Sequence, residues 1–170
     1  MPDPITAPGL IVRIKKKTNG EAALSCERAD GSVTWQRQEG RLASFFPLHD
    51  LTHFAVESVL GFDAAFFGLI ASGWDITDFA APGAKNRVTP QAYAAELFVG
   101  FFDLERATGV LGDARDFAWK AETYCREHKL QPISFRITDE QIVAIRAKRG
   151  ELFAAWQAVP PGETLELRFQ

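Results

Sequence analysis

The chain has 170 residues and a formal net charge of −3, and this length predicts one domain spanning residues 1–170. Hydrophobic residues make up 46% of it, with 14 Phe and 4 Trp, which excludes an intrinsically disordered protein. The negative charge excludes a general attraction to nucleic acid. The longest nearly apolar run, residues 64–71, is too short to cross a bilayer. We therefore expect neither nucleic acid nor a membrane as a partner.

The N-terminal segment and the cysteines bear on the cellular compartment. Residues 1–10 contain three prolines and no apolar core, so they do not resemble a signal peptide. Cys26 and Cys125 are not spaced as a metal or redox motif and are predicted to be reduced, buried thiols. Both features favour a cytoplasmic protein.

Residues 10–38 predict three consecutive strands. Apolar and polar residues alternate over residues 10–15 and again over residues 22–27, and a third strand follows at residues 33–38. An Asn-Gly pair at residues 19–20 and an Asp-Gly pair at residues 30–31 separate them, and such pairs suit tight hairpin turns. The pattern predicts an antiparallel β-meander.

Residues 45–57 hold two of the three histidines, His49 and His53, four residues apart among apolar side chains. We predict a helix from residue 48 or 51 to residue 60, ending at Gly61. On this buried helix His49, His53 and Glu57 share one stripe. The two histidines can bind one metal ion together with a ligand from elsewhere. Glu57 is also a candidate ligand, but it lies about 12 Å along the axis from His49, so it better suits the acceptor that fixes the tautomer of His53.

Residues 49–53 read His-Asp-Leu-Thr-His and resemble the His-Glu-x-x-His helix of zincin metallopeptidases, with Asp at the Glu position. The resemblance implies that His49 and His53 bind Zn²⁺ and that Asp50 is the general base on the metal-bound water. Asp is one methylene shorter than Glu, however, and no Gly-x-x-His extension follows His53. The resemblance covers five residues, and it implies a metal more strongly than a peptidase.

A structural alternative stays open for the same segment. Asp50 can be the N-cap of a helix that begins at Leu51, with Pro47 just ahead of it. Asp50 then accepts a hydrogen bond from the backbone N–H of His53 and has no catalytic role. In that arrangement His49 lies outside the helix.

Glu96 is the best remote carboxylate ligand for the histidine pair. It lies among apolar residues of a helix that Thr89 and Pro90 are expected to open and that reaches about residue 108. The alternative is an ordinary glutamate on a helix surface, which is the more common case.

Other polar residues fit structural roles better than a site. Asp75 and Asp78 have the spacing of oxygen ligands but are more typical of turns and caps. His128 closes a helix predicted over residues 113–129, where a cation faces the negative end of the helix dipole. Residues 80–88 form a loop with Lys85 and Arg87, which is either a charged lid or only a connection.

The remaining pattern defines the fold class. A short helix is predicted over residues 63–72, and Thr138 with Gln141 predicts the capping box of a last helix. Residues 164–169 alternate as a final strand. Strands at residues 10–38, followed by a helical part at residues 48–157 and the final strand, predict an α+β fold. Its antiparallel sheet, joined by the last strand, has helices packed on one face.

Three hypotheses about function follow. In the first, a hydrolase-like protein binds Zn²⁺ or a similar ion through His49 and His53, and Asp50 or Glu57 polarises the bound water. In the second, the chain is a non-catalytic interaction or structural domain, and its Phe and Trp residues form a core and a homodimer interface. The third is metal-free acid–base chemistry by a His–Asp pair. The substrate, a small molecule or a peptide, is not identified by the sequence.

Overall fold

The structure is a computed structural model that describes residues 9–170, so the expectation for residues 1–10 lies almost wholly outside the described residues. Four strands form one antiparallel sheet in the order β3-β2-β1-β4. They are β1 (Leu10–Lys16), β2 (Ala22–Glu27), β3 (Val33–Gln38) and β4 (Thr164–Phe169). The predicted meander and the predicted pairing of the last strand are both confirmed. Leu10 stands opposite Phe169, so the two ends of the domain lie side by side.

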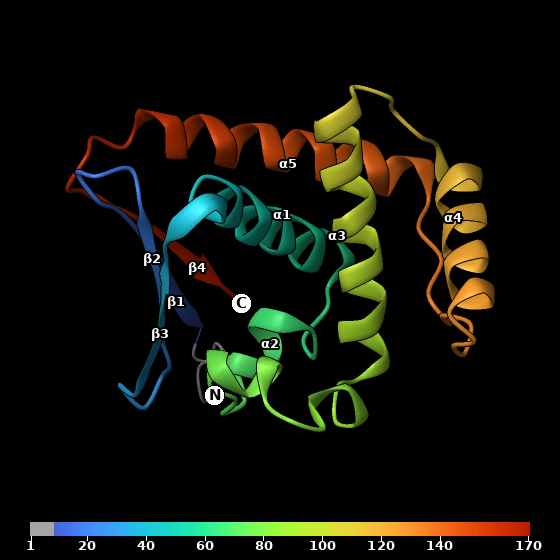
Figure 1. Cartoon of the computed structure of the whole chain (residues 1–170), viewed down its shortest axis with the longest axis horizontal. Coiled ribbons are helices and arrows are strands. Elements are labelled where there is room, and N and C mark those ends of the chain that lie inside the picture. The colour runs from blue at the N-terminus through green and yellow to red at the C-terminus, as the bar shows by residue number, and fades with distance from the viewer. Residues whose placement is uncertain (1–8) are drawn as a thin grey trace, which may run out of the picture.

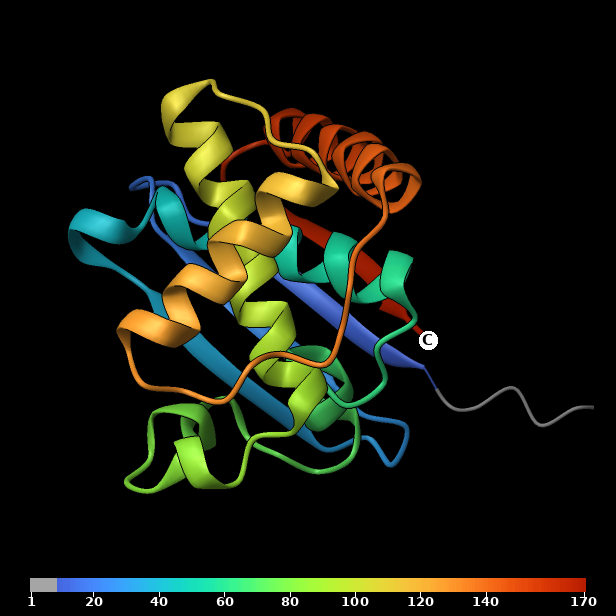
Figure 2. The same ribbon diagram turned by 90° about the vertical axis from the view of Figure 1, so that its right-hand side faces the viewer.

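The helices pack on one face of this sheet, as expected for the α+β class (Figure 1). They are α1 (Phe45–Leu60), α2 (Phe66–Ala71), α3 (Pro90–Thr108), α4 (Ala114–Glu127) and α5 (Asp139–Ala158), with short 3₁₀ turns η1 (Gly40–Leu42), η2 (Ile76–Ala80) and η3 (Ala84–Asn86). The helix α1 packs against both α3 and α5. Figure 2 shows α4 as the outermost layer, in front of α3. None of the helices in residues 9–170 is long and apolar enough to cross a membrane.

The two faces of the sheet differ because side chains alternate along each strand. The face under the helices is buried and contributes Leu10, Val12, Ile14, Leu24, Cys26 and Phe169 to the core. On the opposite face, Arg13 lies 2.6 Å from Glu27 and 2.9 Å from Glu166. The helices therefore cover only the apolar face, and the charged face remains open to water.

The helix α1 begins earlier than the sequence pattern indicates. Its N-cap is Ser44, and it ends at Gly61 in the left-handed region. Pro47 is the third helical residue, where its missing N–H has no intrahelical partner to lose, so it does not mark the first residue. Asp50 consequently lies inside the helix, and the alternative that makes it the N-cap is wrong.

The predicted starts of α3 and α5 agree with the structure, whereas α2 begins at Phe66 and not at residue 63. Thr89 accepts from the backbone N–H of Ala92 at the start of α3, and Thr138 forms a capping box with Gln141 at the start of α5. Asp75 and Asp78 form the capping box of η2, as their favoured interpretation predicts. Both cysteines are free and buried.

Candidate metal centre

Two helices bring the candidate ligands together. His49 and His53 project from the same side of α1, with their ring centroids 4.8 Å apart, as the i, i+4 spacing predicts. The helix α3 packs across α1 and places Glu96 beside them, with Oε1 3.4 Å from Nε2 of His53. One ligand atom from each of His49, His53 and Glu96 lies within 4.8 Å of the other two. The group thus joins a local pair to a residue more than forty positions away.

A carboxylate orients each imidazole from the other side. Nδ1 of His53 lies 3.3 Å from Oε1 of Glu57, and Nδ1 of His49 lies 2.7 Å from Oδ2 of Asp103. A carboxylate beside Nδ1 favours the proton on that nitrogen and leaves Nε2 with a free lone pair. In their neutral forms, both rings are therefore held in the tautomer that binds a metal ion through Nε2.

Glu57 is anchored firmly in this supporting position. Its side chain is fully buried, and its Oε2 accepts a hydrogen bond of 3.0 Å from the backbone N–H of Phe67. Burial raises the pKa of Glu57, while the hydrogen bond from His53 and the backbone N–H of Phe67 lower it. The predicted contact between Glu57 and His53 is confirmed. Because Glu57 lies at Nδ1 and Glu96 at Nε2, the structure does not bring Glu57 into the ligand group.

The charges around His53 favour its protonated form when no metal is bound. Burial lowers the pKa of His53, but the carboxylates of Glu96 and Glu57 outweigh burial and raise it to about 9. An ion that binds through Nε2 therefore competes with a proton at neutral pH.

Asp50 faces a different part of the molecule. Its Oδ2 accepts a hydrogen bond from Nε2 of Gln38, on β3 beneath α1, and the residue is only 6% exposed. Burial raises the pKa of Asp50 to about 6, against the opposing effect of the Gln38 hydrogen bond. Successive helical residues differ in direction by about 100°, so Asp50 reaches the sheet while His49 reaches α3. The structure does not bring Asp50 into the ligand group.

Several residues that hold the site were not singled out from the sequence. Asp103 has one usable signal, because it follows Glu96 by seven residues, which is two helical turns on one stripe. Arg149 of α5 donates to Oγ1 of Thr52 and to the carbonyl of Phe102, both at 3.2 Å. This arginine fixes α1 against α3, and its contacts have no local sequence signal.

The surroundings of the group are aromatic on two sides and open on a third. Phe45 stacks on His49 with centroids 5.1 Å apart, and Phe66 lies 5.4 Å from His53. Both phenylalanines are half-buried. The side chain of Glu96 is 59% exposed, in contrast to 3% for His53. Solvent therefore reaches the group from the side of α3.

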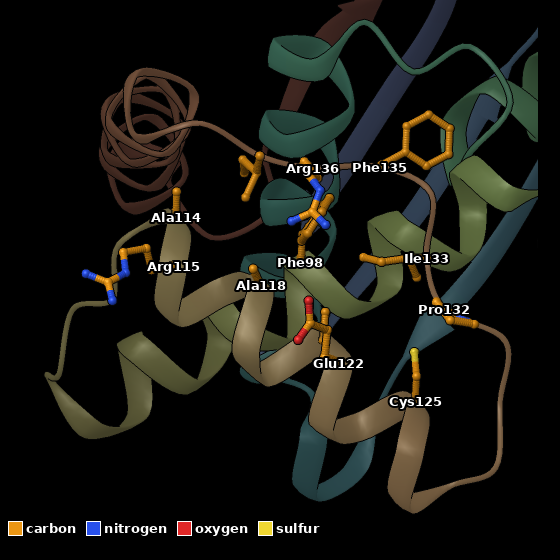
Figure 3. A pocket seen from close by; sticks show the side chains of 12 residues that line it. Phe98, Ala114, Arg115, Ala118, Glu122, Cys125, Pro132, Ile133, Phe135 and Arg136 are labelled. Carbon is orange, nitrogen blue, oxygen red and sulfur yellow. The ribbon is translucent and has the colours of Figure 1, made fainter.

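The other candidates lie outside this group. Nδ1 of His128 lies 2.9 Å from the carbonyl of Tyr124 at the end of α4, and Asp75 and Asp78 cap η2. A cavity of about 330 Å³ lies between α3, α4 and residues 132–137, and Figure 3 shows Ile133 and Cys125 among its lining side chains. No residue of the ligand group lines that cavity.

No protein-family model, curated protein or solved structure matches the chain. The chemistry of the site must therefore be inferred from its geometry.

Proposed function

We propose that this protein binds one divalent metal ion through His49, His53 and Glu96, with Zn²⁺ as the first candidate. The observation that supports the proposal is that one ligand atom from each of His49, His53 and Glu96 lies within 4.8 Å of the other two, while Nδ1 of each histidine is paired with a carboxylate. Tetrahedral Zn²⁺ with bonds of about 2.0–2.1 Å separates its ligand atoms by about 3.3–3.4 Å. Nε2 of His53 and Oε1 of Glu96 are already 3.4 Å apart.

The ligand set favours a reactive site over a structural one. Structural Zn²⁺ sites use four protein ligands, whereas two histidines and one glutamate leave a position for water or substrate. A bound Zn²⁺ supplies a Lewis acid and a water of lowered pKa, which is the basis of metal-assisted hydrolysis. The zincin resemblance supports His49 and His53 as ligands. The position of Asp50 against Gln38 gives no support to its role as general base.

The same donor set also suits non-haem Fe(II), which uses two histidines and one carboxylate on one face of an octahedron. The exposure of Glu96 agrees with an ion that keeps several positions for other ligands. Fe(II) is therefore the second candidate ion, and elemental analysis distinguishes it from Zn²⁺.

The proposal is tested by metal content and thermal stability together. We expect one equivalent of metal in the purified protein, and its loss in His53→Ala and in Glu96→Gln. The matched control is His128→Ala, which removes the histidine outside the group and should retain the metal. An ion at 100 times its Kd stabilises the folded state by about 2.7 kcal/mol. A chelator should therefore lower the Tm of the wild type by about 5–10 °C and leave His53→Ala unaffected.

A wild type that binds none of Zn²⁺, Co²⁺ and Fe²⁺ and whose Tm is indifferent to chelator would contradict the proposal. The histidine helix would then be scaffold, as in the interaction-domain hypothesis.

A further inference from the structure

The side of α4 that faces the core carries small side chains. Ala114, Ala118, Ala121 and Cys125 recur at spacings of four, three and four residues, which places them on one stripe of the helix. All four line the cavity of about 330 Å³ between α4, α3 and residues 132–137 (Figure 3). Protein interiors leave few voids larger than a water molecule. The small side chains of this stripe leave the cavity unfilled, whereas larger ones would occupy it.

The cavity is apolar inside and charged at its opening. The buried residues that line it include Phe98, Ala121, Cys125 and Ile137. The exposed residues that line it are Arg115, Glu122, Pro132 and Arg136. Apolar walls with a few charged groups at one side are typical of a site for a small molecule.

The charged groups at the opening favour an anion. Two arginines and one glutamate leave an excess of one positive charge there, on a chain whose formal net charge is −3. None of the three takes part in an ion pair within residues 9–170. Figure 3 shows the guanidinium of Arg136 among the other lining side chains and that of Arg115 turned away from them. Arginine binds a carboxylate through two parallel hydrogen bonds, so Arg136 is the residue suited to hold one.

Residues 132–137 form one wall of the cavity. They belong to no helix or strand, and none of the backbone–backbone hydrogen bonds within residues 9–170 includes them. The segment is attached instead by apolar packing, in which Phe135 contacts Phe62 with ring centroids 5.0 Å apart and Ile137 is buried. A segment without backbone pairing opens at a low free-energy cost, so a ligand can enter beside it.

We infer that this cavity binds a small carboxylic acid with an apolar body. The carboxylate pairs with Arg136 at the opening, and the body lies along the alanines of α4 against Phe98. A cavity of about 150 Å³ holds one benzene, so a cavity of about 330 Å³ holds a body of about eight to twelve carbons. The inference is independent of the metal site, because no residue of the ligand group lines this cavity.

The test compares octanoate with 1-octanol by calorimetric titration of the full chain at pH 7. The two probes have the same chain length, and only octanoate carries a charge. We expect octanoate to bind about tenfold more tightly, because its carboxylate pairs with Arg136. Arg136→Gln should remove this preference. Glu122→Gln should strengthen octanoate binding by about two- to threefold, because it removes a like charge at the opening, and should leave 1-octanol unchanged.

Arg126→Gln is the matched control, because Arg126 is an exposed arginine of α4 that does not line the cavity. This variant should retain the full preference for octanoate. Ala118→Leu fills the cavity from α4 and should abolish binding of both probes without lowering the Tm. His53→Ala should bind octanoate as the wild type does, which separates this cavity from the metal site.

Three results would each overturn the inference. The first is a wild type that binds no octanoate at about 5 mM, a concentration at which even weak binding is measurable. The second is a preference for octanoate that survives Arg136→Gln, and the third is full binding by Ala118→Leu. Because Arg136 is exposed, its substitution tests the inference even if Ala118→Leu does not fold.

Discussion

Replacing Glu57 by Gln tests whether the buried carboxylate sets the tautomer of His53. In the wild type, one oxygen of Glu57 faces Nδ1 of His53 and the other accepts from the backbone N–H of Phe67. A glutamine can satisfy only one of these partners as an acceptor. If its oxygen stays on Phe67, its NH₂ group donates to Nδ1 and moves the histidine proton to Nε2, where it blocks the metal.

The expected loss of affinity is large for a change of one atom. Removing a supporting carboxylate from a metal-bound histidine costs 10–100-fold in affinity. The forced tautomer places Glu57→Gln at the upper end, about 100-fold or about 2.7 kcal/mol. The alternative orientation of the glutamine leaves the N–H of Phe67 unpaired, which costs about 1–3 kcal/mol of stability. Both readouts are measurable, by competition with a chromogenic chelator for Zn²⁺ and by thermal melts in chelator.

Asp103→Asn is the matched comparison for the other histidine. The second oxygen of Asp103 accepts no hydrogen bond within residues 9–170 but lies 3.7 Å from Nη2 of Arg106, so an asparagine can keep its oxygen on His49 and turn its NH₂ group to that side, at the cost of this ion pair. We expect a loss of about tenfold, from the missing charge alone. The reasoning is refuted if Glu57→Gln binds Zn²⁺ within twofold of the wild type, or if Asp103→Asn loses more affinity than Glu57→Gln.

Three further predictions concern proton binding and the core. Burial raises the pKa of Asp50 from 3.8 to about 6. The contribution of protonated Asp50 to the free energy of unfolding is therefore fully present below about pH 4 and is lost as the pH rises through 6. In urea titrations of the metal-free protein, the wild type should therefore lose about 3 kcal/mol of stability between pH 4 and 7, and Asp50→Asn should not show this loss. Zn²⁺ binding at pH 7 should release about one proton, because the pKa of His53 is about 9 in the metal-free protein; calorimetry in two buffers measures this, and a release near zero contradicts it. Phe54→Ala should lower the free energy of unfolding by about 3–5 kcal/mol, because Phe54 is 5% exposed and packs on Phe67 and Phe169; a loss below about 1 kcal/mol in denaturant would show a surface position.

The features that the sequence predicts well are those set by neighbouring residues. Strand alternation, the two hairpin turns, the caps at Thr89 and Thr138, and the contact of Glu57 with His53 depend on spacing within one element. The predicted start of α1 was wrong because a proline such as Pro47 is tolerated at several positions of the first turn. The position of Pro47 therefore does not determine the residue at which the helix begins.

The features that the sequence misses depend on how elements pack. Asp50 invites interpretation as a base or a cap, but its partner Gln38 is on β3, and only the rotation of α1 over the sheet brings them together. Glu96 was a candidate from its apolar surroundings alone. The seven-residue spacing places Asp103 on the stripe of Glu96, but only the packing of α3 on α1 brings it to His49. No local signal indicated that Arg149 would fix the two helices through Thr52.

The charge of the cluster is a further argument for a cation. Glu57, Glu96 and Asp103 surround two imidazoles, and within residues 9–170 the one arginine paired with these carboxylates, Arg106, lies 3.7 Å from Asp103. A divalent ion bound beside Nε2 of His53 would place positive charge next to Glu96, whose Oε1 lies 3.4 Å from that nitrogen. Burying a carboxylate as fully as Glu57 costs free energy unless it is paired. An apolar residue in its place would leave both the backbone N–H of Phe67 and Nδ1 of His53 without their partner, so Glu57 supports the fold and the histidine together, and Glu57→Gln is the change that separates the two effects.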